Sequence, residues 1–406
     1  MKNVLLIIGL SLVTVAAFGQ KKAVKDAMRL AKDAKPNYNE ARALIKGALD
    51  NPETKGDAET WFSAGEIEDA QFTAENTKAM LGQQPNEPVM YDALANSLPY
   101  YLEAYKLDQL PDAKGKVKPR YQKKIQGTLG ANHIYYLNGG AYYFDKQDYP
   151  KACNFFEQYL EISDYPAFKD LQFAQRDSNY MIVQFYLAVA STQLDNKDVA
   201  IKNLVRAKDT PYRQHDVYQY LCYEYLTNGD TATYEKTLEE GMKVFPDSSY
   251  YLLNLIALYL GSDREEKAVQ YLNTAIAQDP NNSDLYQALG SVYEQRKELD
   301  KAEANFIKSL DLAPESPVAL TNVGRIYYNQ AVNKLGDANL ITDQALYTKE
   351  KDAAMDMFKK ALPYFKKAFD IKPDDPERDV LVALRGIYYN LNMSKEFDEI
   401  DALMNK

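Results

Sequence analysis

The segment 249–316 repeats itself with a period of 34 residues. When 249–282 is aligned with 283–316, five apolar or small positions coincide: Leu255 with Leu289, Tyr259 with Tyr293, Ala268 with Ala302, Leu272 with Phe306, and Pro280 with Pro314. A period of this length indicates stacked copies of one small motif, because such a motif cannot bury its apolar face alone. The chain of 406 residues is also longer than a single globular core usually supports.

Within each repeat the spacing predicts two antiparallel helices, because apolar residues recur every three or four positions. Gly290 and Ala302 are small where we expect the two helices to cross, since a large side chain there would hold the backbones apart. Tyr293 and Phe306 fill the space beside that crossing. Pro314 ends the second helix because proline lacks the N–H of a helical residue.

The order Leu289-Gly290, Tyr293, Ala302, Phe306, Pro314 resembles the signature of the tetratricopeptide repeat, a helix–turn–helix family. The resemblance implies an all-α fold, a right-handed superhelical solenoid of helix–turn–helix repeats. It also implies that the first helix of each repeat lines the inner, concave face of the solenoid.

The same phase extends beyond this segment, with repeat starts at 181, 215, 249, 283 and 317. The other expected repeats are irregular: 22–55, one from Ala58 with a late second helix at 97–104, 133–166 followed by an extension over 167–180, and a terminal one from Arg378. We therefore expect about nine repeats, two of them with insertions. The later insertion, at about 332–356, should contain a loop over 333–341 and a helical stretch over 347–360.

The chain begins with the pattern of a secretory signal peptide. Lys2 precedes an apolar run over 4–18, and Ala17-Phe18-Gly19 offers small residues for cleavage before Gln20. The run is short for a membrane span, although an uncleaved anchor helix is the alternative. Because no later run is long enough to cross a membrane, we expect no transmembrane segment in the mature chain. The predicted location is the periplasm or cell envelope, with the protein soluble after cleavage.

These signals give a predicted domain organisation: a signal peptide over 1–19, N-terminal repeats with an insertion over 20–110, a basic linker over 111–124, and the main array over 125–406 with a C-terminal cap from about 378. The linker is the one strongly basic stretch, with Lys116, Lys118, Arg120, Lys123 and Lys124. It is either a basic patch for an acidic partner or surface, or a solvated linker.

No set of residues forms a recognisable catalytic or metal-binding motif. His133 and His215 fall in different repeats and have no Cys or His neighbour at zinc-ligand spacing. Cys153 and Cys222 also lie in separate repeats, so we expect two buried, unpaired thiols. The net charge of −10 disfavours nucleic-acid binding, which needs a basic face. We predict no enzymatic activity, no catalytic residue, no cofactor and no metal.

Surface recognition is the remaining function, and the family resemblance assigns it to the first helices. Transferring the family's inner-face positions to this sequence gives a candidate partner-binding set: Phe185, Tyr223, Tyr250, Leu253, Gln287, Arg325 and Tyr328. Thr321 and Asn329 fall at further positions of the same face. Asn254 and Asn322 match asparagines that hold a peptide carboxylate in some members, but the lysines of that mode are missing. The competing interpretation is that several of these aromatic residues pack against the inserted helices.

The sequence therefore favours an exported, non-enzymatic scaffold that binds a partner protein or peptide along its concave face, within an envelope complex or outside one. If that face does not bind, the insertions around 82–89 and 336–345 are the next candidates. A glycan-binding module of the cell envelope that uses exposed aromatic residues is the alternative function. The single tryptophan and the absence of a lipid-anchor cysteine count against it.

Overall fold

The structure is a computed structural model that describes residues 21–171, 178–372 and 377–405. The predicted signal peptide lies outside these residues. Within the described ranges the chain is helical and has no strand, as expected of an all-α protein. The chain divides into two compact units, Met1–Tyr234 and Glu235–Lys406, which we call the N-terminal and C-terminal units.

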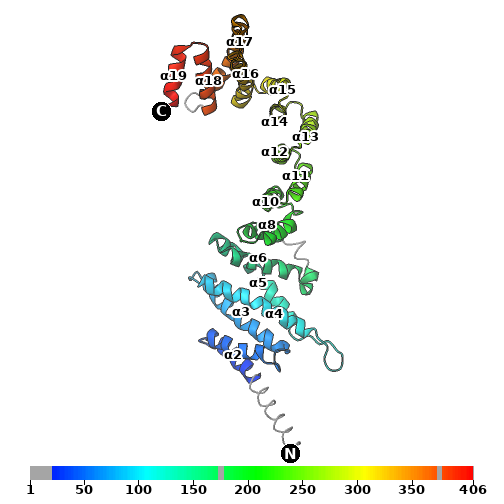
Figure 1. Cartoon of the computed structure of the whole chain (residues 1–406). Helices are drawn as coiled ribbons and strands as arrows, with labels where there is room; N and C mark the ends of the chain where they lie inside the picture. The colour runs from blue at the N-terminus through cyan, green and yellow to red at the C-terminus, as the bar shows by residue number, and fades with distance from the viewer. Residues whose placement is uncertain (1–20, 172–177, 373–376, 406) are drawn as a thin grey trace, which may run out of the picture. The chain divides into compact units, whose positions relative to one another are not determined.

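The N-terminal unit begins with a helix over residues 21–31. Its further helices are α2 (Tyr38–Asp50), α3 (Ala58–Met80), α4 (Glu87–Asp108), α5 (Gln122–Asp145), α6 (Tyr149–Asp164), the 3-10 helix η1 (Pro166–Leu171), α8 (Asn179–Thr192), α9 (Lys197–Ala207) and α10 (Gln214–Thr227) (Figure 1). The division between the units falls inside α11 (Thr231–Val244).

The C-terminal unit continues with α12 (Ser249–Leu260), α13 (Glu265–Gln278), α14 (Ser283–Gln295), α15 (Leu299–Leu312), α16 (Pro317–Ala338), α17 (Gln344–Ile371), α18 (Arg378–Asn390) and α19 (Ser394–Met404). The described ranges contain eighteen α-helices in succession, enough for the nine repeats that the sequence predicts. Among the described residues, no helix is both long and apolar enough to cross a membrane.

Side-chain caps explain where several of these helices begin. The Asn282 side chain accepts a hydrogen bond from the Asp284 N–H, and Ser316 accepts one from the Ala319 N–H. Each cap satisfies a backbone donor that has no partner inside the helix. Pro317 follows Ser316 at the first helical position, where its missing N–H costs nothing. The predicted starts at 249, 283, 317 and 378 are therefore confirmed.

The helices of a pair cross at small residues, as the repeat pattern predicts. A Cβ atom added at Gly290 would lie 2.6 Å from the ring of Phe306, which has no exposed surface. At Gly140 it would lie 2.3 Å from the Phe156 ring. Phe306 and Ala302 form one core cluster of the C-terminal unit. The crossing residues thus let an aromatic ring lie directly against the backbone of the facing helix.

Three predicted boundaries were wrong, because helices extend into the irregular segments. α16 runs to Ala338, so most of 333–341 is helical, whereas the expected loop is confined to a few residues after it. The predicted helix over 347–360 is confirmed as part of α17. The second helix expected late, at 97–104, also begins earlier, because α4 starts at Glu87. The predicted linker over 111–124 ends earlier, because α5 starts at Gln122 and runs into the repeat expected at 133.

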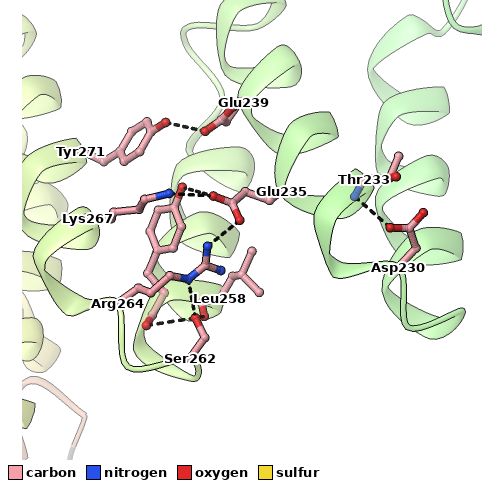
Figure 2. Close-up of polar contacts among 10 residues, drawn as sticks. Asp230, Thr233, Glu235, Glu239, Leu258, Ser262, Arg264, Lys267 and Tyr271 are labelled. Atoms are coloured by element: carbon pink, nitrogen blue, oxygen red, sulfur yellow. Dashed lines mark hydrogen bonds and ion pairs between the residues drawn. The ribbon is translucent and has the colours of Figure 1, made fainter.

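A tyrosine–carboxylate contact joins helices of neighbouring pairs in the C-terminal unit (Figure 2). The Tyr259 hydroxyl donates to Glu235 Oε1 at 3.0 Å, and Arg264 and Lys267 bind the same carboxylate at 2.7 and 3.3 Å. The contact recurs two repeats later, where the Tyr327 hydroxyl donates to Glu303 Oε1 at 2.6 Å. The tyrosine of the repeat signature therefore fills the core with its ring and fixes the preceding pair with its hydroxyl.

Candidate partner-binding site

The structure divides the seven predicted binding residues between the two units. Phe185 and Tyr223 lie in the N-terminal unit, on α8 and α10, and the other five lie in the C-terminal unit. Tyr223 is 62% exposed, whereas Phe185 is only 3% exposed and belongs to the core. The assignment of Phe185 to a binding face is therefore wrong.

Neighbouring residues account for the burial of Phe185. The Tyr212 ring lies edge-on to it at 5.6 Å, and the Arg213 guanidinium stands 5.0 Å above its centre. Arg213 has a positive φ of 49° just before α10 begins. This left-handed residue turns the chain so that the start of α10 covers the ring.

In the C-terminal unit the first helices lie side by side, as the family resemblance implies. The Gln295 side chain on α14 donates to the carbonyl of Leu260 on α12 at 3.3 Å. Arg325 on α16 binds the Glu294 carboxylate on α14 at 2.8 Å. We call this surface of α12, α14 and α16 the first-helix wall.

The predicted residues on this wall differ in how accessible they are. Leu253 is exposed, whereas Gln287 and Tyr250 are half-buried, and the Tyr250 ring packs against Tyr251 at 5.2 Å. Tyr328 lies edge-on to Phe358 and Phe365 of α17, at 5.7 and 6.3 Å. For Tyr328 the competing interpretation is therefore correct, because its ring packs against the lengthened second helix.

A cavity of about 390 Å³ lies where the first-helix wall reaches α18. We call it the α16–α18 cavity, and its lining residues are Val318, Thr321, Asn322, Arg325, Tyr328, Asn329, Phe365, Glu377, Asp379, Val382 and Ala383. Its size falls in the range of about 300–1,000 Å³ that is typical of ligand sites. The structure thus brings the predicted residues Arg325 and Tyr328 into one concave site.

The polar groups of this cavity are only partly engaged. Arg325 uses one terminal nitrogen for both Glu294, at 2.8 Å, and Asn322 Oδ1, at 3.2 Å. The buried hydroxyl of Thr321 has no hydrogen-bond partner in the part of the chain that the structure describes. A buried hydroxyl without a partner costs free energy that a ligand with a matching group would recover.

Two exposed valines flank the cavity, Val318 on α16 and Val382 on α18, which are 44% and 47% exposed. The acidic residues Glu377 and Asp379 stand at the start of α18. Sequence reasoning missed Val382 because it interpreted the last helix pair only as a cap, and it did not select Val318 on α16. The available signal was the apolar Val382, which has the charged Arg378, Asp379 and Arg385 three or four positions away on the same helix.

The predicted basic patch covers the loop before α5 and the first turn of that helix. Lys116, Lys118 and Arg120 lie on the loop, Lys123 and Lys124 lie in α5, and all five are exposed. Asp108 accepts hydrogen bonds from the backbone N–H groups of Arg120, Tyr121 and Gln122, at 2.8, 2.8 and 3.0 Å. Lys118 is 3.6 Å from Asp112, and the Lys124 ammonium lies 5.6 Å above the Phe62 ring. The loop is therefore fixed at its end by a buried aspartate while its lysines face solvent.

The side chains of His133, Cys153 and Cys222 are buried among the packed helices. His133 is buried, with Nε2 at 3.1 Å from the Tyr159 carbonyl and 3.0 Å from the Ser163 hydroxyl. Cys153 and Cys222 are buried and unpaired, as predicted, and burial raises the pKa of the Cys222 thiol to about 12. No cluster of three metal-ligating side chains occurs within the described ranges.

Comparisons with known proteins identify the repeat. Residues 271–304 match the family model of the tetratricopeptide repeat. A comparison with curated proteins finds no match. The paired helices and the first-helix wall define a helical-repeat protein. The matched segment lies inside that array, so this part of the chain contains a tetratricopeptide repeat, as the 34-residue period predicts.

Solved structures of several repeat proteins are similar to this chain at low sequence identity. A TPR repeats protein from Bacteroides fragilis is 18% identical, with a TM-score of 0.32 over 67% of this chain and 98% of that one. MamA from Desulfovibrio magneticus is 14% identical, with a TM-score of 0.31 over 46% of this chain and 95% of that one. PilW, a type IV pilus biogenesis factor, is 17% identical, with a TM-score of 0.36 over 55% and 91%. Likenesses at these TM-scores carry no argument about function.

Proposed function

We propose that this protein is an exported, non-enzymatic scaffold that binds a segment of a partner protein in the α16–α18 cavity. The supporting observation is the cavity itself, where predicted wall residues meet two exposed valines and a buried, unpartnered hydroxyl. Tetratricopeptide arrays typically present such surfaces to other proteins. A place in an envelope complex follows from the predicted export.

The lining suggests how a partner segment is held. An apolar side chain of the partner packs between Val318 and Val382, and its backbone hydrogen-bonds to Thr321 and Asn329. Glu377 and Asp379 favour a basic residue next to that apolar anchor, since Arg325 is already paired with Glu294. The partner is therefore a segment with an apolar anchor and a basic neighbour.

Substitution of Val382 tests this function. Val382→Asp places a charge at the apolar anchor, so we expect capture of the partner from an envelope extract of the source organism to fall by about tenfold or more. The matched control is Leu346→Asp, because Leu346 is 46% exposed at the start of α17 and does not line the cavity. The measurement is quantitative recovery of each captured protein with the wild type and both variants.

A selective loss with Val382→Asp supports the proposal, provided that both variants keep the wild-type circular dichroism spectrum. Equal capture by the wild type and Val382→Asp contradicts the proposal. Tyr223, Leu253 and the insertions around 82–89 and 336–345 then become the candidates for partner binding. After a selective loss, a photo-crosslinking residue in place of Val318 identifies which segment of a captured partner lies at the cavity.

A further inference from the structure

The N-terminal unit contains a second cavity, which differs in character from the partner-binding site. It measures about 500 Å³ and lies between the second helices α2 and α4, with α3 behind it. We call it the α2–α4 cavity. Seven of its ten lining residues come from the second helices α2 and α4, and Trp61, Ala64 and Glu68 come from the first helix α3. None of them is among the predicted inner-face residues, and the proposed protein-binding function does not use this cavity.

Two aromatic rings form a corner in this cavity. Trp61 on α3 is the only tryptophan of the chain, and its ring centre lies 6.2 Å from that of Tyr100 on α4, with the planes inclined at 47°. The indole N–H donates to the Lys55 carbonyl at 2.7 Å, which fixes the orientation of the ring. Both rings are half-buried, so each leaves part of its surface accessible from the cavity.

An internal ion pair forms the inner wall. Glu68 is buried, and its two carboxylate oxygens accept hydrogen bonds from Arg42 at 2.7 and 2.5 Å. Arg42 also donates to Gln71 Oε1. The charges of Glu68 and Arg42 cancel, so the inner wall offers a ligand fixed polar groups without net charge.

Three polar side chains at the rim remain unengaged. Lys46 and Asp50 on α2 and Asn96 on α4 are exposed and make no side-chain hydrogen bond or ion pair within the described residues. Together they supply donors and acceptors, and the two rim charges are opposite. With the inner ion pair, the whole lining contains two cationic and two anionic groups.

We propose that the α2–α4 cavity binds a neutral saccharide. A pyranose ring has an apolar C–H face, which packs on an aromatic ring, and a rim of hydroxyl groups, which need both donors and acceptors. The Trp61–Tyr100 corner provides the first surface, while Asn96, Asp50 and Lys46 provide the second. The balanced charge gives an anionic sugar or a phosphate no advantage over a neutral one.

The single tryptophan makes a direct measurement of this site possible. The full-length protein is titrated with neutral oligosaccharides of glucose, xylose and mannose and with an anionic oligogalacturonide, while Trp61 fluorescence is recorded. We expect at least one neutral oligosaccharide to change the fluorescence saturably, with the anionic sugar no tighter. Tyr100→Ala should weaken binding by about tenfold, because it removes one ring of the corner.

Controls separate ring stacking from a folding defect. Tyr100→Phe keeps the ring and should retain binding, and Asn96→Ala, at an exposed position, should weaken it by about threefold. Tyr223→Ala removes an exposed tyrosine of the same unit elsewhere and should leave the titration unchanged. The proposal is overturned if no neutral sugar perturbs Trp61, if Tyr100→Ala binds like the wild type, or if an unstructured peptide saturates the same signal more tightly.

Discussion

Gly290 is the residue at which the register of the repeats is most directly testable. A side chain there would meet the Phe306 ring, so Gly290→Leu should lower the free energy of unfolding by about 1–3 kcal/mol or more through overpacking. Gly261 is the matched control, because its φ of −80° suits any residue and its nearest neighbour is a backbone oxygen at 3.4 Å. Gly261→Ala should change stability by less than about 0.5 kcal/mol. Urea titration of both variants compares them, and equal small losses would mean that the helices do not cross at Gly290.

Single residues were predictable where the repeat fixes their surroundings. The crossing glycine, the aromatic ring beside it and the buried Cys222 follow from positions that recur at one period. Phe185 was not predictable in this way, because Tyr212 and Arg213, which cover its ring, belong to the irregular turn before α10. A position transferred from a family gives the direction of a side chain but not what a neighbouring loop places over it.

At the scale of elements, the contact between Glu235 and Tyr259 should make stability depend on pH. Burial by itself raises the pKa of Glu235, but hydrogen bonds from Arg264, Tyr259 and Lys267 outweigh it and hold this pKa below the usual value. A depressed pKa in the folded state adds stability above the unfolded-state pKa of about 4.3, and this stability is lost as the pH falls through the folded-state pKa.

Glu235→Gln should therefore lower the free energy of unfolding by about 1 kcal/mol at pH 7, since a charge-assisted acceptor is lost. The difference from the wild type should shrink below about pH 4, where the wild-type carboxylate itself becomes protonated. Glu266→Gln is the control, because Glu266 forms an ion pair with Arg296 but is 70% exposed. Urea titrations at pH 7 and below about pH 4 test this prediction. If the stability difference between Glu235→Gln and the wild type is the same at both, the effect belongs to packing instead.

Element boundaries were predictable where a cap or a proline marks them, as at Ser316 and Pro317. The expected loop over 333–341 failed because Gly336 interrupts only an exposed face of the helix, where an added Cβ would meet nothing within 4 Å. Ala331 and Ala338 are fully buried, so packing keeps this part of α16 helical. Burial of small apolar residues thus outweighed the low helix propensity of one glycine.

At the scale of the whole molecule, the sequence predicted the architecture better than the sites. The α16–α18 cavity combines predicted residues with Val318 and Val382, which sequence reasoning did not select. Val382 was missed because α18 was interpreted as a cap. The α2–α4 cavity was missed altogether, because most of its lining comes from second helices and Trp61 on α3 is not among the predicted inner-face residues. Both sites depend on contacts between successive pairs, and the repeat signature describes only the interior of one pair.

Predicted export is the whole-molecule property that would determine which partners and saccharides either site can meet. The apolar run over 4–18 and Ala17-Phe18-Gly19 predict that the protein isolated from its native host begins at Gln20, which intact-mass measurement determines. Leu6→Arg interrupts the apolar run, so this variant should retain Met1 and stay in the cytoplasmic fraction. Leu403→Arg, at the other end of the chain, is the control that adds the same charge without touching the signal. A native chain that still carries residues 1–19 contradicts cleavage, and its recovery with the membranes would favour the uncleaved anchor helix. An uncleaved chain in the cytoplasmic fraction would place the scaffold inside the cell and remove envelope proteins and envelope glycans as its ligands. A Leu6→Arg protein processed like the wild type would show that the apolar run is not the export signal.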